Sequence, residues 1–259
     1  MASLDGQRIV VTRGKGQASS LVDRLHELGA TVVEVPAIEI AAPPDLGPLD
    51  AAVGALDQYG WIVVTSTNAV AALLSRLTVL GLYPRLCGRG TKLASLGPAT
   101  TAALRASFPE DRVAVEPKAD FRAEGLLAAF ADRKLAGQRS LVPSSTSARD
   151  ELPEGLRRLG AQVEVVGAYA TVEPVGLDAA VARCLDDGFD LALFASPSAL
   201  EAFARAAGER ASGLPVAVIG PTTEAAARAS GLDVRGVASP STVEALLATA
   251  ERLLARPRS

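Results

Sequence analysis

The chain contains an internal repeat, and this feature constrains the fold more than any other. Residues 8–38 match residues 139–169 at an offset of 131, which places Gly29 on Gly160. Three further pairs of segments follow in the same order: 61–73 with 191–203, 95–107 with 218–230, and 122–130 with 242–250. Because the order is kept, the 259 residues hold two copies of one folding unit, each the size of a small domain.

Each copy alternates short runs of β-branched residues with helical patterns. This alternation is typical of an α/β unit in which helices cover both faces of a parallel sheet. The helical pattern at residues 18–28 ends at Gly29, and its counterpart in the second copy ends at Gly160, the usual place of a glycine after a helix. We expect two five-stranded sheets, with strands at residues 8–12, 31–35, 61–65, 92–96, 112–116, 139–143, 162–166, 190–195, 215–219 and 233–237.

The sequence does not determine how the strands of the two copies are distributed between the two domains. No linker rich in Pro, Gly or Ser separates them, whereas β-forming residues at 36–40 and 167–171 run past the strands that precede them. Two arrangements are therefore allowed. The domains are either arranged in tandem and divided near residue 135, or they exchange their first strands through these two crossings.

Composition excludes several classes of protein. With 49% apolar and 21% charged residues, the chain is too apolar to be disordered. Only 4% of the residues are aromatic and the net charge is -3, which argues against a nucleic-acid-binding surface. No apolar run reaches the roughly 18 residues of a membrane span, and the first residues do not form a signal peptide. Since Cys87 and Cys184 form no CxxC motif, we expect a soluble cytoplasmic protein that contacts no membrane and no nucleic acid.

Hydroxyl and Gly-Pro turns follow most of the predicted strands and lead into helices. In open α/β sheets such turns lie at the carboxyl edge, where ligands bind. Their backbone N–H groups and the positive ends of the helix dipoles favour carboxylates or phosphates, although the same residues also serve as ordinary helix caps. We expect an anionic ligand to be held between two lobes. The candidate binding residues are Arg13, Thr65, Ser66, Asn68, Gly97, Thr100, Ser144, Ser145, Ser196, Pro197, Gly220, Thr222 and Thr223.

Strong catalytic groups are scarce. His26 is the only histidine and belongs to a solvated helix flank, which argues against Ser-His-Asp chemistry and against a histidine metal site. The sequence has no paired-carboxylate motif and no metal-ligand spacing, so we predict no metal site. An enzyme of this kind would act by positioning and electrostatics with a weak acid. Tyr169 is a candidate, since it lies at a predicted crossing and its repeat partner is the apolar Ile38, although a tyrosine in a strand most often serves packing.

One turn partly imitates a dinucleotide-binding fingerprint. Gly14-Lys15-Gly16 follows a strand, and Glu34 comes twenty residues after Gly14. Ser19 stands in place of the third glycine, and the matching turn of the second copy has no glycine. A plain turn is therefore the favoured interpretation.

The ordered motifs resemble those of the uroporphyrinogen-III synthase family over nearly the whole chain. They are Val11-Thr12-Arg13 with Gln17 and Gly29, TSTNAV at 65–70, SLGPATTAAL at 95–104, AEGLL at 123–127, Arg149-x-Glu151-Leu152 in a helix that runs to Gly160 and then Tyr169, FASPSAL at 194–200, and IGPTTEAA at 219–226. The chain departs from the family at Ala123, where serine is frequent, and at Ser144-Ser145-Thr146, where a turn with glycine is commoner.

The resemblance implies two flavodoxin-like domains joined by a two-stranded β-ladder that acts as a hinge, which selects the exchanged arrangement. Domain 1 would then comprise residues 1–36 and 173–259, and domain 2 residues 37–172.

The resemblance also implies a reaction. The family converts hydroxymethylbilane, a linear tetrapyrrole with eight carboxylates, into uroporphyrinogen III by loss of water and ring closure with inversion of ring D, and it uses no cofactor. By this resemblance the chain is a cyclising lyase of tetrapyrrole biosynthesis and a cytoplasmic monomer, with hydroxymethylbilane synthase as a candidate partner upstream. Tyr169 corresponds to a family tyrosine and becomes the candidate catalytic residue, and Arg149 joins the candidate substrate-binding residues.

Two other functions remain open from the residues alone. A non-catalytic bilobed sensor of small anions would share the two α/β lobes and the anion-binding turns but would not need Tyr169. A nucleotide-dependent enzyme would use the turn from Gly14 to Gly16.

Overall fold

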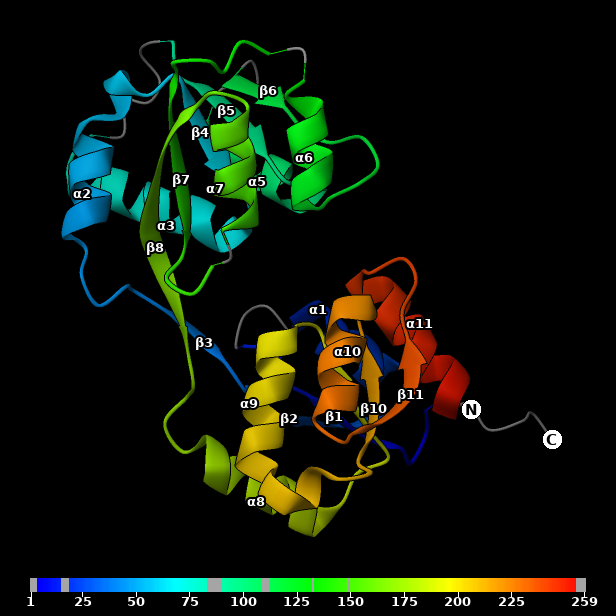
Figure 1. The fold of residues 1–259 in the computed structure, drawn as a ribbon. Helices are drawn as coiled ribbons and strands as arrows, with labels where there is room; N and C mark the ends of the chain where they lie inside the picture. The colour runs from blue at the N-terminus through cyan, green and yellow to red at the C-terminus, as the bar shows by residue number, and fades with distance from the viewer. Residues whose placement is uncertain are drawn as a thin grey trace. The chain divides into compact units, whose positions relative to one another are not determined.

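The computed structural model describes residues 4–14, 19–82, 90–108, 112–131, 133–148 and 150–254. The chain divides into two compact units (Figure 1). Unit 1 is Met1–Glu39 with Val172–Ser259, and unit 2 is Ile40–Thr171. The described residues form ten α-helices and two sheets in an α/β arrangement, as the alternating pattern predicts.

The sheet of unit 1 combines strands from both ends of the chain. Its order is β11-β10-β9-β1-β2, and every pairing in it is parallel. The central strand β9 pairs with β1, with Ile9 opposite Leu191. This is the exchanged set of strands and not the tandem one. The strands are β1 (Arg8–Val11), β2 (Thr31–Glu34), β9 (Leu191–Phe194), β10 (Pro215–Val218) and β11 (Asp233–Val237).

Helices cover both faces of this sheet, because successive strand residues point to opposite sides. In β1, Val10 packs into one apolar core with α8, α9 and α10, whereas Ile9 and Val11 pack into the other core with α1 and α11. Both cores consist of buried apolar side chains, most of them Val, Leu and Ala. The helices are α1 (Ser19–Glu27), α8 (Leu177–Asp187), α9 (Pro197–Ala207), α10 (Pro221–Ala229) and α11 (Val243–Leu254).

The sheet of unit 2 has one strand more than the sequence predicts. Its order is β3-β8-β7-β4-β5-β6, and the extra strand is the short β3 (Glu39–Ala41) at the edge beside β8. β8 (Gln162–Val172) is also longer than predicted, because it continues through residues 167–171. Both proposed crossings thus contain β-strand. The remaining strands are β4 (Trp61–Val64), β5 (Lys92–Ser95), β6 (Val113–Val115) and β7 (Arg139–Ser145).

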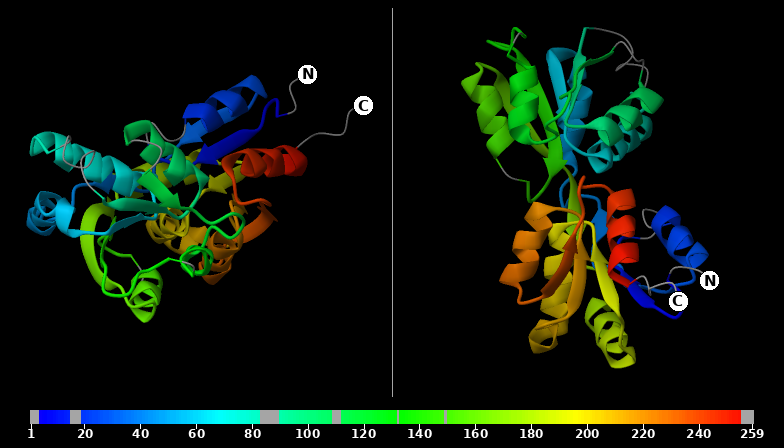
Figure 2. Two further views of the ribbon diagram at one scale, coloured as in Figure 1. Left: turned by 90° about the horizontal axis from the view of Figure 1, so that it is seen from above. Right: turned by 90° about the vertical axis from the view of Figure 1, so that its right-hand side faces the viewer.

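Unit 2 is likewise covered on both faces (Figure 2). One core lies between the sheet and the helices α2 (Gly47–Gly54), α3 (Thr67–Val79) and α5 (Pro98–Ser107). The other lies under α6 (Ala123–Ala129) and α7 (Glu151–Arg158), where Trp61 meets Phe130 edge to face with ring centroids 5.0 Å apart. Short 3-10 turns complete the description, at Leu56–Gln58 in unit 2 and Gly208–Ala211 in unit 1.

The two copies end their first helix in the same way. Gly29 follows α1 and Gly160 follows α7, and each has a φ of +87°. This left-handed conformation is strained for residues with a Cβ, which explains why both copies carry glycine at the matched position. The repeat in the sequence is therefore a repeat in backbone geometry as well.

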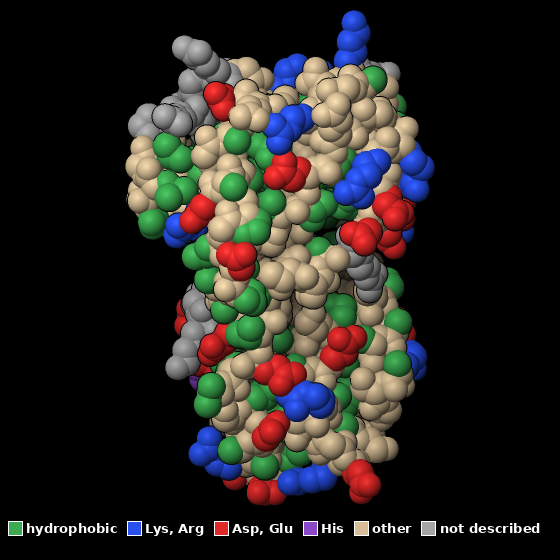
Figure 3. Space-filling model, turned by 60° about the vertical axis from the view of Figure 1, so that its left-hand side comes forward, with side chains coloured by type: hydrophobic (Ala, Val, Ile, Leu, Met, Phe, Trp, Pro, Cys, Tyr) green, Lys and Arg blue, Asp and Glu red, His purple; other side chains and the backbone are tan. Residues whose placement is uncertain are grey.

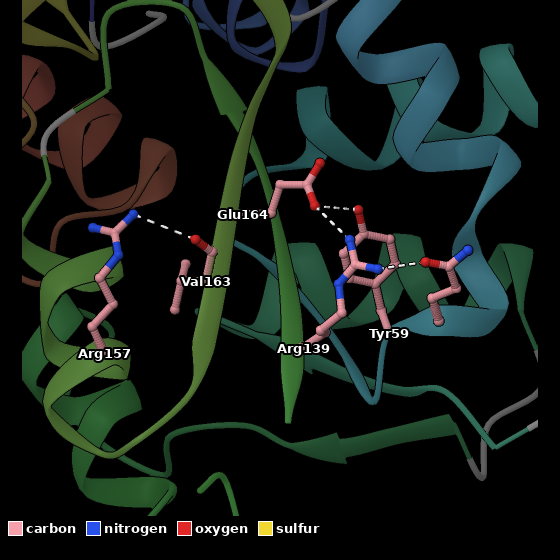
Figure 4. Close-up of polar contacts among 6 residues, drawn as sticks. Tyr59, Arg139, Arg157, Val163 and Glu164 are labelled. Carbon is pink, nitrogen blue, oxygen red and sulfur yellow. Dashed lines mark hydrogen bonds and ion pairs between the residues drawn. The ribbon is translucent and has the colours of Figure 1, made fainter. Parts of the chain in front are cut away.

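A network of polar side chains connects the amino-terminal ends of neighbouring strands in unit 2 (Figure 4). The Tyr59 hydroxyl donates a hydrogen bond of 2.7 Å to Glu164, and Arg139 forms an ion pair of 2.9 Å with the same carboxylate oxygen. The Arg139 guanidinium also lies 4.7 Å from the centroid of the Tyr59 ring. The network ties β7 and β8 to the turn before β4, at the end of the sheet opposite to the predicted ligand edge, so its role is structural.

This network makes the stability of unit 2 depend on pH in the alkaline range. Burial, reinforced by Glu164, raises the pKa of Tyr59 from 10.0 to about 12. Because the folded pKa exceeds the unfolded one, the stabilisation is complete below pH 10 and is lost as the pH rises toward 12. We expect Tyr59→Phe to lower the unfolding free energy at pH 8 and to flatten its fall between pH 10 and 12. Urea unfolding across that range measures both, and an unchanged slope in the variant would contradict the assignment.

Candidate active site

The predicted binding residues gather at the carboxyl edges of the two sheets. At the edge of unit 2 lie residues that follow β4 and β5, the last two residues of β7, and Tyr169 within β8. At the edge of unit 1 lie residues that follow β1, β9 and β10. The first group contains Thr65, Ser66, Asn68, Gly97, Thr100, Ser144, Ser145 and Tyr169, and the second contains Arg13, Ser196, Pro197, Gly220, Thr222 and Thr223. Arg149 lies outside the described residues.

Ser66 and Tyr169 form a hydrogen-bonded pair at the edge of unit 2. Ser66 is the N-cap of α3, and its hydroxyl accepts the N–H of Ala69 at 3.1 Å. The same oxygen lies 3.1 Å from the hydroxyl of Tyr169, which belongs to β8 and is half-buried. Through Ser66 the phenol is thus connected to the first turn of a thirteen-residue helix. The pair brings together residues 103 positions apart in the sequence.

The matching position in unit 1 has the cap without the tyrosine. Ser196 caps α9 and accepts the N–H of Ala199 at 3.2 Å. The repeat partner of Tyr169 is Ile38, whose side chain packs against the apolar core of unit 1. The two copies therefore share their helix caps, but only the edge of unit 2 carries a phenol.

Glycine-proline turns begin α5 and α10 and are covered in the same way in both units. Gly97 and Gly220 are N-caps in extended conformation, and a proline follows each of them. A Cβ at Gly220 would lie 2.3 Å from the hydroxyl of Ser241, and a Cβ at Gly97 would lie 3.4 Å from the Cβ of Phe121. Ser241 and Phe121 both come directly before a repeated segment, so equivalent loops cover the two turns. Phe121 is 45% exposed beside the Gly97 turn, and our reading of the sequence overlooked it.

Several of the predicted hydroxyl groups belong to buried residues. Thr100 and Ser144 are each 6% exposed and Thr223 is 2% exposed, whereas Thr222 is exposed. Ser144 donates to the carbonyl of Ser145 at 3.3 Å. At such positions a ligand can contact the backbone more readily than the buried side chain. The sequence alone does not show which of these residues are buried.

Arg13 is a half-buried cation at the edge of unit 1. In the part of the chain that the structure describes, it has neither a hydrogen bond nor an ion pair. Burial lowers the pKa of Arg13, and the negative charge of Glu244 acts in the opposite direction. A partly desolvated guanidinium with unused donors is well suited to a carboxylate, for which its planar fork is complementary.

Other features of the surface bear on the alternative functions. On the face shown in Figure 3, acidic and basic side chains of the described residues are interspersed without a large patch of one sign. Within the described ranges, no cluster of three or more His, Cys, Asp or Glu could hold a metal ion, and no helix could span a membrane. Of the turn that imitates a dinucleotide fingerprint, Gly14 follows β1, while Lys15 and Gly16 lie outside the described residues.

A model of one protein family, described as uroporphyrinogen-III synthase HemD, matches residues 19–248 of this chain. The chain belongs to the uroporphyrinogen-III synthase family. This confirms the resemblance carried by the ordered motifs. A uroporphyrinogen-III synthase from Synechococcus elongatus is 31% identical over 235 residues, which cover 85% of each chain. A putative uroporphyrinogen-III synthase from Methanothermobacter thermautotrophicus is 29% identical over 228 residues, 83% of this chain and 86% of the relative.

Solved structures of the family share the fold. A mutant uroporphyrinogen III synthase from Thermus thermophilus aligns over 96% of this chain and 99% of its own, with a TM-score of 0.65 at 18% identity. The uroporphyrinogen-III synthetase from Helicobacter pylori aligns over 95% of this chain and 99% of its own, with a TM-score of 0.61 at 17% identity. At these identities the likeness establishes the α/β fold.

The equivalent N-cap serines, Ser66 and Ser196, allow the energy of the Ser66–Tyr169 contact to be measured. Ser66→Ala and Ser196→Ala each remove an N-cap, which costs about 1 kcal/mol of unfolding free energy. We expect Ser66→Ala to cost roughly 0.5 to 1.5 kcal/mol more, because it also removes the partner of Tyr169. In a Tyr169→Phe background this excess should disappear while the effect of Ser196→Ala stays the same. An excess that persists in the urea-unfolding data of that background would show that the two hydroxyls are not coupled.

Proposed function

We propose that this chain catalyses the reaction of its family, the conversion of hydroxymethylbilane into uroporphyrinogen III with loss of water and inversion of ring D. The observation that carries the proposal is the Ser66–Tyr169 hydroxyl pair at a carboxyl sheet edge in a chain of this family. Incubation with hydroxymethylbilane, oxidation and isomer analysis of the porphyrin test it directly. Formation of the uninverted isomer alone would refute it and leave the anion sensor or a nucleotide-dependent enzyme as alternatives.

The two sheet edges suit a flexible polyanion. A substrate with eight carboxylates needs many donors spread over a wide surface, and helix N-termini supply backbone N–H groups with the positive end of the dipole. We assign substrate contacts to the turns of Ser66, Gly97, Ser196 and Gly220 and to Arg13. The buried Thr100, Ser144 and Thr223 would contribute through their backbone, and Thr65, Asn68, Ser145, Arg149, Pro197 and Thr222 complete the proposed binding set.

Tyr169 is the proposed catalytic residue. The bond between the hydroxymethyl carbon of ring A and its oxygen breaks as the pyrrole nitrogen supplies electron density to that carbon, and the oxygen leaves as water. The phenol of Tyr169 donates a hydrogen bond or proton to this oxygen. Ring D then attacks the carbon through its substituted alpha position, the bond from that position to the methylene of ring C breaks, and this methylene joins the free alpha position of ring D. The proton lost from that free position balances the proton taken by the water. The protein must favour this attack over the uninverted closure.

A pair of tyrosine variants tests the catalytic role. We expect Tyr169→Phe to fold normally and to lower kcat about tenfold or more, the low end of general-acid effects. Tyr59→Phe is the matched control, since it also removes a hydroxyl with a polar partner in unit 2 but lies at the amino ends of the strands. Its kcat at pH 7 should equal that of the wild type. Wild-type turnover by Tyr169→Phe would remove this residue from the mechanism.

Arginine variants test the binding role. Arg13→Gln removes a half-buried guanidinium, and we expect KM to rise about tenfold because hydrogen bonds to charged groups contribute roughly 1.5 to 3 kcal/mol. Arg210→Gln is the control: Arg210 belongs to the same unit and is exposed in an ion pair with Asp186. Its KM should stay unchanged. Equal KM values for both variants and the wild type would show that Arg13 does not bind substrate.

The domain organisation is part of the proposal. We take unit 1 and unit 2 as the two flavodoxin-like domains, close to the ranges 1–36 with 173–259 and 37–172 implied by the resemblance. The chain passes from one unit to the other within β3 and at the end of β8, which pair in one sheet, and this two-stranded ladder would act as the hinge. Crystal forms in which each unit superposes closely while the angle at the ladder differs would support this, and a constant angle would contradict it.

We further propose that the chain acts in the cytoplasm, as a monomer that receives its substrate from hydroxymethylbilane synthase. Because hydroxymethylbilane closes spontaneously to the uninverted isomer, work in the same compartment as that synthase would limit this loss. Light scattering on the purified chain, alone and mixed with that synthase, tests the monomer and any lasting complex.

A further inference from the structure

Unit 2 contains a cavity of about 260 Å³ next to Tyr169. It lies between α2, α3, the segment that leads from β3 to α2, and β8. Tyr169 and Asn68, two of the residues singled out from the sequence, line one end of it. Specific pockets for whole drug-sized ligands start at about 300 Å³, so this cavity suits one part of a large ligand and not a whole tetrapyrrole.

The walls of the cavity fit a flat apolar group. The side from α3 presents the small residues Ala71, Ala72 and Ser75, which leave room beside the helix. Leu46, which is half-buried, lines the opposite side. A pyrrole ring is flat and offers apolar faces, so it would bury those faces against these side chains and leave its polar substituents at the ends.

The two ends of the cavity are polar. Tyr169, whose hydroxyl is bonded to Ser66, lines one end, and Arg76 lines the other. Arg76 is eight residues beyond Asn68 on α3, so the cavity extends about 12 Å along the helix. Arg76 uses two N–H groups on Asp50, at 2.6 and 2.8 Å, and a guanidinium has five in total. A carboxylate at this end can therefore still find donors on Arg76.

We propose that this cavity is a subsite for the hydroxymethyl-bearing terminal ring of the substrate. The inference rests on the proposed function and adds to it the place of one ring. The ring lies between α3 and the Leu46 side chain, its hydroxymethyl group faces Tyr169, and the carboxylate of a side arm reaches toward Arg76. In this arrangement the leaving oxygen is next to the phenol of Tyr169. The other three rings of the substrate extend out along the carboxyl edge of the sheet.

Filling the cavity tests the subsite. Ala71 lines the cavity yet is exposed, so Ala71→Phe can fill the space without disturbing the apolar core. We expect KM for hydroxymethylbilane to rise about tenfold or more, since burial of an aromatic-sized apolar group is worth roughly that factor. Val79→Phe is the control, because Val79 lies on the same helix, is 66% exposed and is not part of the cavity. Its KM should match the wild type.

A direct binding measurement makes the result independent of turnover. Porphobilinogen, a single pyrrole with one acetate and one propionate, serves as the probe at millimolar concentration. We expect it to shift the methyl resonances of Ala71 and Ala72 in the wild type and in Val79→Phe. The change in the Ala72 methyl resonance should be absent in Ala71→Phe. It should also be absent in Ser75→Phe, because Ser75 lines the cavity from an exposed position as well. Melting temperatures identify any variant that fails to fold.

The outcomes separate this inference from the function on which it rests. If the wild type forms no uroporphyrinogen III, the proposed function fails whatever the cavity binds. If the wild type forms it and the folded Ala71→Phe and Ser75→Phe keep its KM, the function stands and the subsite is refuted. Shifts of the Ala72 methyl that persist in the filled variants would likewise place the pyrrole elsewhere.

Discussion

The parallel pairing of β1 with β9 is the constraint on which the rest of the structure depends. It joins residues about 180 positions apart, with Ile9 opposite Leu191, in the middle of the unit 1 sheet. Once the first copy has placed β1 and β2 in this sheet, its remaining strands have to build the second sheet together with β7 and β8. The chain must then pass between the units twice. The two passages end up as β3 and the extended β8, and the second of them carries Tyr169.

The repeat explains why the two units have matching edges and why only one carries the phenol. Equivalent turns give each sheet edge a serine cap and a glycine-proline cap, with the same backbone donors at the same places. Residue 169 is a tyrosine held by Ser66, whereas its counterpart Ile38 packs into a core. The proposed binding turns are thus present twice and the candidate acid once. This asymmetry fits a substrate with many similar carboxylates and a single leaving oxygen.

The sequence predicted the strands of both copies because each is a short, mostly apolar run and many contain β-branched residues. It predicted the helix ends because only glycine takes a φ of +87° easily. It missed β3, whose three residues include the exposed Glu39 and carry no alternating pattern. The choice between tandem and exchanged strands depends on pairing over long distances, which periodicity does not encode. The cavity beside α3 depends on the distance between α2 and α3. The burial of Thr223 depends on the segments that pack around it. Neither can be derived from local sequence patterns.

The reaction needs selectivity more than it needs strong acids. Hydroxymethylbilane closes by itself, so the protein has to lower one of two competing barriers relative to the other. A hundredfold preference corresponds to about 2.7 kcal/mol. Hydrogen bonds contribute about 0.5 to 1.5 kcal/mol each, or more when one partner is charged, so two or three contacts that fit only the inverting geometry are enough. The N–H groups of the paired turns, Arg13 and the phenol of Tyr169 can supply contacts of this size. His26 belongs to the last turn of α1 and not to the proposed site. Its absence from that site is no obstacle to this chemistry, because the proposed mechanism requires a shape that holds the substrate and one weak acid.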